Sequence, residues 1–272
     1  GRALSCSTDH DLTVAVGPFT GRIPREDTAL GVAEGTTKEI AILSRVGKPV
    51  CFTIVSVSGP DSQPVLVLSR RRAQEIAQQA LMSELKPGMV IPATVTHMEP
   101  FGAFVDIGCG LVSMIGIEHI SISRIPHPSC RFSVGQEIHA AVLETLPEQG
   151  RVKLTHRELL GTWAENARDF APGMTVEGTV RGLKDYGAFI ELTPNLSGLA
   201  EPRTDLREGD RVSVFLKAML PERMKIKLLV IERLPPATET AALHYFIREG
   251  RLAHWRYAPD GCRKAGVETT FL

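Results

Sequence analysis

One segment of this chain occurs twice. The residues from Lys86 to Ile107 return with substitutions from position 171 to position 192, and Gly102 and Gly187 lie 85 residues apart. This offset is too long for a solenoid repeat, which measures about 20–50 residues, and fits a complete small domain. The element that recurs is an aromatic residue followed by Gly-Ala-Phe. The repeat therefore predicts at least two domains that carry aromatic rings at the same place.

The charge balance limits how such a chain can bind nucleic acid. The 272 residues include 31 basic and 31 acidic ones, so the formal net charge is zero. Phosphate affinity normally depends on an excess of lysine and arginine. We therefore expect any nucleic-acid binding to be local and to depend on stacking.

Cysteine usage and hydropathy indicate the compartment. The five cysteines are scattered and include no C-x-x-C pair, which argues against a disulfide framework or a zinc ribbon. No apolar run approaches the ~20 residues that a membrane helix needs, and no signal-peptide core follows the opening Gly1-Arg2-Ala3. That opening lacks methionine, as in a processed chain or a fragment. We expect a cytoplasmic protein without membrane association, cofactor or metal.

Strand-like runs separated by glycine, proline and small polar residues fill both copies of the repeat. Five short strands in about 70 residues predict a small closed barrel, which has no exposed sheet edge. The runs are 90–98, 103–107, 115–120, 137–144 and 151–154 in one copy, and 175–182, 188–192, 198–200, 211–218 and 225–230 in the other. Residues 1–70 resemble a degenerate further copy that lacks the aromatic element; in chain order this is the first copy, and the two full repeats are the second and third copies.

The remaining segments predict connecting helices and a C-terminal appendage. Apolar residues at helical spacing predict linker helices within 71–85 and 157–170, between domains at 1–70, 86–156 and 171–234. The last segment, 235–272, predicts a helix over 238–248 and then a hairpin around Ala258-Pro-Asp-Gly261.

The aromatic residues of the repeat are three positions apart, Phe101 with Phe104 and Tyr186 with Phe189. On a regular strand such residues point to opposite faces. A bend or bulge at the glycine between them would bring both rings to one surface. The alternative is one ring in the core and the other exposed by chance. Because both copies keep both rings and the glycine, we favour a stacking surface, where each base contributes about 1–3 kcal/mol.

Several motifs together resemble the S1-type RNA-binding domain, an OB-fold barrel. They are Phe101-Gly-Ala-Phe-Val105, Tyr186-Gly-Ala-Phe-Ile190, Gly116-Ile-Glu-His-Ile-Ser121 and Arg151-Val-Lys-Leu-Thr155. The resemblance covers 86–158 strongly, 171–230 well and 1–70 weakly. The tandem arrangement is also similar to bacterial ribosomal protein S1 and its shorter relatives in Firmicutes. The resemblance implies an all-β fold of tandem five-stranded OB-fold barrels joined by short helices, with a C-terminal helix and hairpin.

The resemblance also implies an RNA-facing set of two aromatic residues, a histidine, an aspartate and an arginine. The aspartate position falls on Leu146 in the second copy, and the histidine position falls on Glu201 in the third, which we therefore expect to bind RNA more weakly. In the first copy the histidine and arginine positions fall on Pro24 and Val65. The RNA-binding residues expected from this transfer, with Lys153 added because it alternates with Arg151, are Phe101, Phe104, His119, Arg151, Lys153, Tyr186, Phe189 and Lys225.

Two functions from different classes remain open. The first is non-catalytic binding of single-stranded RNA, with messenger RNA and the ribosome as partners in translation. The second is a protein–protein adaptor that docks on the ribosome or on RNA polymerase, which the zero net charge and the degenerate first copy favour. No G-x-S-x-G, H-E-x-x-H or P-loop motif suggests an enzyme. In the tail, basic residues surround Trp255 and Tyr257; these rings either contact RNA or dock the hairpin on a barrel, and we favour docking.

Overall fold

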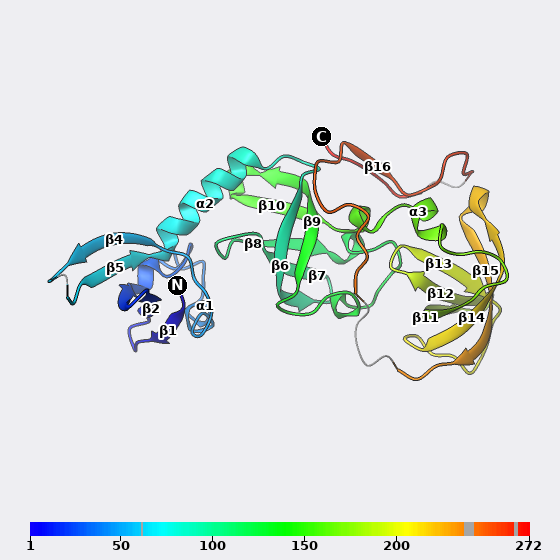
Figure 1. Ribbon diagram of the computed structural model, residues 1–272, viewed down its shortest axis with the longest axis horizontal. Helices are drawn as coiled ribbons and strands as arrows, with labels where there is room; N and C mark the ends of the chain where they lie inside the picture. Colours follow the sequence, from blue (N-terminus) through cyan, green and yellow to red (C-terminus); the bar gives the residue numbers. More distant parts are fainter. Residues whose placement is uncertain (61, 237–241, 264–265) are drawn as a thin grey trace. The chain divides into compact units, whose positions relative to one another are not determined.

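The computed structural model describes residues 1–60, 62–236, 242–263 and 266–272 (Figure 1). It contains two compact units. One comprises Gly1–Glu84, Asp106–Val112 and Pro147–Gly150, and the other comprises Leu85–Val105, Ser113–Leu146 and Arg151–Leu272. Short strands dominate both units, so the predicted all-β class is confirmed.

The second copy of the repeat forms a closed five-stranded barrel, as predicted, with strand order β10-β8-β7-β6-β9. We call it the second barrel. Alternation along its strands separates core from surface: Val152 and Leu154 are buried, whereas Arg151 and Lys153 are exposed. Its strands are β6 (Val90–Glu99), β7 (Gly102–Asp106), β8 (Val112–Gly116), β9 (Glu137–Leu146) and β10 (Arg151–Thr155).

The third copy forms another closed barrel, the third barrel, with order β11-β12-β13-β15-β14. Apolar side chains such as Val180, Ile190 and Leu216 fill its interior. The two barrels therefore share one topology, which makes their positions comparable strand by strand. The strands are β11 (Thr175–Lys184), β12 (Gly187–Thr193), β13 (Leu196–Ala200), β14 (Arg211–Leu220) and β15 (Lys225–Arg233).

The first copy is a five-stranded sheet in the order β1-β2-β3-β5-β4, not the closed barrel that we expected. Its β1 has four residues, whereas β6 and β11 have ten each, and β1 is too short to pair along both β2 and β4. One bridge, between Arg2 and Pro49, lies on the side where a barrel would close. The strands are β1 (Ala3–Cys6), β2 (Leu12–Val16), β3 (Phe19–Ile23), β4 (Thr53–Ser58) and β5 (Val65–Ser69).

The first predicted linker helix is present as α2 (Arg70–Glu84). At its start, the Ser69 hydroxyl accepts a hydrogen bond from the Arg72 backbone amide. The second linker is not one helix. It divides into a 3₁₀ turn, η5 (Arg157–Leu160), and a short helix, α3 (Trp163–Ala167). Gly161 separates them with a φ of 82°, which favours glycine. The other short helices are η1 (Arg25–Asp27), α1 (Ile40–Leu43), η2 (Ile117–His119), η3 (Pro128–Cys130), η4 (Pro147–Gln149) and η6 (Pro221–Arg223).

The tail differs from its prediction in one element. Part of the helix expected over 238–248 lies outside the described residues, and 242–248 forms no helix or strand, so the helical prediction there is wrong. The reason is that its polar groups bond elsewhere: the Phe246 amide donates to the Leu159 carbonyl, and the Tyr245 hydroxyl bonds with His156. The predicted strand pair is present as β16 (His254–Arg256) and β17 (Glu268–Thr270).

The aromatic residues of the tail are buried in the core of the unit that contains the third barrel. Trp255, Tyr257 and Phe271 belong to the same apolar cluster as Trp163 and the barrel interior. The Tyr257 hydroxyl also donates to the Asn195 carbonyl. This packing supports the interpretation that the hairpin docks by its aromatic rings.

No helix in the described part of the chain is both long and apolar enough to cross a membrane.

Candidate nucleic-acid interface

The two aromatic residues of the repeat meet in both barrels. The ring centroids of Phe101 and Phe104 lie 6.0 Å apart at 88°, and those of Tyr186 and Phe189 lie 6.1 Å apart at 86°. Phe101 is 56% exposed and Tyr186 is 65% exposed, and the second ring of each pair is also accessible. The predicted convergence of the rings is confirmed, and the alternative with one ring in the core is wrong.

A tight turn brings the rings together. Phe101 and Tyr186 lie in the turns that precede β7 and β12, so strand alternation does not apply to them. The glycine that follows approaches the next strand closely. A Cβ atom at Gly102 would lie 2.5 Å from the Ile115 carbonyl oxygen, inside van der Waals contact. The glycine therefore allows β7 to approach β8 closely, and this close approach places the two rings on one surface.

In the third barrel, strand register places a cation in line with the aromatic pair. Gly182, Phe189, Leu199 and Lys227 are cross-strand neighbours on β11, β12, β13 and β15. Leu199 and Lys227 are both exposed, so this row faces solvent. Lys225 lies two residues before Lys227 and is exposed on the same face.

The second barrel has a similar row. Lys153 is the cross-strand neighbour of the exposed Met114. The His97 ring on β6 lies 6.0 Å from the Phe104 ring at an interplanar angle of 26°. Arg151 shares the exposed face of β10 with Lys153, as expected. Each barrel thus offers two or three rings and two cations for a single strand of nucleic acid.

Two acidic residues near these rows are paired with lysines. Lys153 lies 2.8 Å from Glu144, whereas Lys227 faces Ala218 across the equivalent pair of strands. Glu201, the residue from which we expected weaker RNA binding by the third copy, lies 2.9 Å from Lys217. Its charge is therefore largely compensated. Among the residues that the structure describes, Arg151, Lys225 and Lys227 form no ion pair.

Comparison with known families identifies the second barrel. Residues 84–157 match the S1 RNA binding domain. The resemblance stated from the sequence motifs is thus confirmed.

Around this S1 domain, the chain is similar to ribosomal proteins. It is 34% identical over 188 residues to small ribosomal subunit protein bS1 of Leuconostoc lactis, covering 62% of this chain and 44% of that protein. It is 29% identical over 221 residues to the bS1 homolog of Bacillus subtilis (strain 168), covering 75% and 57%. The chain spans about half the length of these relatives. A solution structure of GSP13 from Bacillus subtilis matches with 26% identity over 27% of this chain and 57% of that one, with a TM-score of 0.26.

The strand register corrects one correspondence inferred from the motifs. Lys153 pairs with Met114 as Lys227 pairs with Leu199, so Met114 and Leu199 are equivalent. Two residues further on, Glu201 is then equivalent to Gly116 and not to His119. The motifs had aligned Gly198 with Gly116, whereas the register aligns Gly198 with Ser113. The motif alignment was therefore shifted by three residues.

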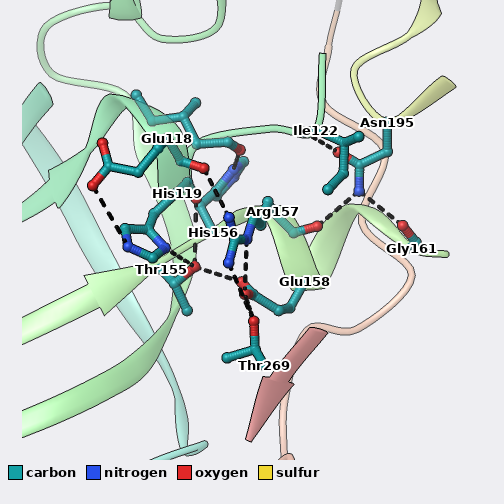
Figure 2. Close-up of polar contacts among 11 residues, drawn as sticks. Glu118, His119, Ile122, Thr155, His156, Arg157, Glu158, Gly161, Asn195 and Thr269 are labelled. Atoms are coloured by element: carbon teal, nitrogen blue, oxygen red, sulfur yellow. Dashed lines mark hydrogen bonds and ion pairs between the residues drawn. The ribbon is translucent and has the colours of Figure 1, made fainter. Parts of the chain in front are cut away.

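His119 of the S1 domain lies in a polar network at the end of β8 and β10 (Figure 2). Its Nε2 is 3.6 Å from Glu118, and its Nδ1 is 3.4 Å from the Thr155 hydroxyl. Burial, with a further contribution from Arg157, lowers the pKa of His119. Both ring nitrogens therefore face protein groups, which limits what His119 offers to a ligand.

The buried carboxylate of Glu158 is the centre of this network. It accepts hydrogen bonds from Thr155 at 2.5 Å, Thr269 at 2.7 Å and Arg157 at 3.1 Å (Figure 2). Such a buried charge requires several partners to offset its desolvation. The network joins the end of β10 to the C-terminal strand pair and so holds the strand that carries Arg151.

A second buried group lies beside it. His156 is fully buried, with Nδ1 2.7 Å from the Ile120 carbonyl and Nε2 2.9 Å from the Tyr245 hydroxyl. Burial lowers the pKa of His156 to about 4. The neutral imidazole is therefore part of the folded state and not a phosphate-binding cation.

Two residues of these rows were missed in the sequence. Lys227 was detectable, because it alternates with Lys225 just as Lys153 alternates with Arg151. His97 gave no repeat signal, because the third barrel has Gly182 at that position.

Proposed function

We propose that this chain is a non-catalytic protein that binds single-stranded RNA and acts in translation. Unpaired bases stack on Phe101 and Phe104 of the S1 domain and on Tyr186 and Phe189 of the third barrel. The match to the S1 RNA binding domain and the similarity to ribosomal proteins support this class. The cations proposed to hold the RNA backbone are Arg151, Lys153, Lys225 and Lys227. Messenger RNA on the ribosome is the proposed partner.

The observation that carries the proposal is the equal geometry of the two ring pairs. Two barrels of different sequence hold an aromatic pair at nearly the same separation and angle. Exposed rings beside cations suit single-stranded nucleic acid, because every base has a face that can stack. Sequence preference should therefore be mild. For His119, we propose at most a hydrogen bond at the border of the surface.

Fluorescence anisotropy with a labelled single-stranded RNA of ~15 nucleotides tests the proposal, since one OB fold covers about 4–16 nucleotides. The variants are Phe101→Ala/Phe104→Ala, Tyr186→Ala/Phe189→Ala, and both pairs combined. We expect each pair to weaken binding and the combination to abolish most of it. Phe19→Ala is the matched control, because it removes an exposed ring of the first sheet that belongs to neither pair.

The salt dependence provides an independent check. Neutralising Z phosphates of a single strand gives a log–log slope of about −0.7Z. Absence of wild-type binding at low salt would overturn the proposal, and so would a combined variant that binds as tightly as wild type.

The first sheet favours a second candidate function, protein docking. Ile54, Val55 and Val57 on β4 and Val65 on β5 are exposed aliphatic residues, and β4 is at the edge of its sheet. Exposed apolar edge strands are typical sites of pairing with another chain. An adaptor would bind nuclease-treated small ribosomal subunits even without its four stacking rings. It would lose this binding in Ile54→Lys/Val57→Lys.

A further inference from the structure

On the basis of the RNA binding proposed above, we infer that His97 is a third stacking ring of the S1 domain. The domain then takes a longer run of unpaired bases than the third barrel does.

The position of His97 is the first support. Its ring is nearly parallel to the Phe104 ring, at 26° and 6.0 Å, whereas Phe101 meets Phe104 edge-on. The His97 side chain is 62% exposed. The three rings therefore form one accessible surface, with Phe104 in the middle.

The orientation of the imidazole is the second support. His97 Nε2 lies 2.6 Å from Glu99 Oε1, two residues along the same part of the chain. A ring held through one nitrogen at its edge keeps its face free for a base. The same contact occupies one carboxylate oxygen of Glu99, so this oxygen is not free to face an approaching phosphate.

The third barrel provides the comparison. Gly182 is the direct cross-strand neighbour of Phe189, so this barrel has no ring where the S1 domain has His97. A Cβ atom at Gly182 would meet no clash, because its nearest neighbours, on Glu208 and Phe189, lie 4.0 Å away. The two barrels thus differ at this position in ring content.

The test uses the full chain with one barrel silenced at a time. In Tyr186→Ala/Phe189→Ala, the further change His97→Gly should weaken binding of single-stranded RNA at least about fivefold, the effect of losing one stacked base. His97→Phe, which keeps a ring but loses the Glu99 contact, should retain most of the affinity. The probes are labelled oligouridylates of increasing length, and only the longer ones should distinguish His97→Gly from its parent.

The reciprocal change provides the matched control. In Phe101→Ala/Phe104→Ala, the substitution Gly182→His should tighten binding to the third barrel. Urea unfolding should show that the His97 variants remain folded under the binding conditions, because the side chain is exposed; His97→Gly should be slightly less stable than its parent, because glycine weakens a strand interior.

The outcomes separate this inference from the proposed function. Equal binding by His97→Gly and its parent, together with binding by Phe101→Ala/Phe104→Ala that is weaker than in the wild type, would overturn the third ring and leave RNA binding intact. If His97→Phe binds as weakly as His97→Gly, His97 contributes to RNA binding through a polar contact, and the inference that it stacks on a base is wrong. No binding by the wild type overturns both.

Discussion

The ammonium group of Lys153 lies 2.8 Å from the carboxylate of Glu144 on the adjacent strand. In the third barrel, the equivalent Lys227 faces Ala218. The S1 domain therefore has the fuller set of rings and the more compensated cations, whereas the third barrel has fewer rings and freer cations. RNA binding by the S1 domain should therefore depend more on stacking, and RNA binding by the third barrel should depend more on charge.

Glu144→Ala should increase RNA affinity, because it frees Lys153 to meet a phosphate. A surface ion pair contributes about 0.2–1 kcal/mol, so the gain should be up to about fivefold in Kd, with a steeper salt dependence. Anisotropy titrations at several salt concentrations measure both. Glu137→Ala, another exposed carboxylate on β9, is the control and should have less effect. An unchanged salt slope in Glu144→Ala would contradict the proposed role of Lys153.

Gly102→Ala should destabilise the S1 domain and weaken RNA binding. The new methyl group would lie 2.5 Å from the Ile115 carbonyl oxygen, so the strands must separate or the turn must shift. We expect a loss of about 1–3 kcal/mol in the free energy of unfolding, measured by urea titration. Gly182→Ala is the control, because its Cβ has open space. Equal stability of the two variants would show that the close approach is not required.

Mild acid should destabilise the unit that contains His156. The pKa of this imidazole is about 4 in the folded state and ordinarily 6.5, so between these values only the unfolded chain binds the proton. Stability should therefore fall as pH decreases from about 6.5 to 4, by on the order of 3 kcal/mol in total. Above pH 7 the group should contribute no pH dependence.

Urea unfolding at a series of pH values measures the slope, and His156→Gln should reduce it. An NMR titration of His156 in the wild-type protein gives a second reading that does not depend on a variant that folds. Protonation of this ring near pH 6.5 would contradict the prediction.

Tyr257→Phe should destabilise the same unit by about 1–3 kcal/mol, because it leaves the buried Asn195 carbonyl without the tyrosine hydroxyl. Thermal unfolding measures the change. Tyr186→Phe removes an exposed hydroxyl and is the matched control, with no expected change. A similar small shift in both variants would mean that the hairpin is not held by this bond.

Local pattern was sufficient to predict the second and third barrels, but not that the first copy stays open. Alternation in segments such as Arg151–Thr155 indicated strands directly. The repeated glycine indicated a bend or bulge that brings the rings together, whereas the structure has a turn just before the strand. The helix expected over 238–248 failed where it is described, because Tyr245 and Phe246 bond to a distant part of the fold. Spacing along the chain carries no information on such contacts.

The site was predicted less completely than the barrels. Glu201 was matched with His119 through a motif glycine, and the true correspondence depends on cross-strand register, which a single sequence does not display. The ion pair of Glu144 with Lys153 is equally non-local. The position of His97 could be recognised only after its ring was seen beside Phe104.

The amide of Asn195 in the third barrel donates to the carbonyls of Arg157 and Gly161 and accepts from the Ile122 amide (Figure 2). With the tail rings packed into the same core, this bonding makes residues on both sides of the second linker parts of one cooperative folding block. A cut in that linker would expose Trp163 and leave buried polar groups unpaired. The smallest fragment that retains a native S1 domain should therefore include the third barrel and the C-terminal hairpin.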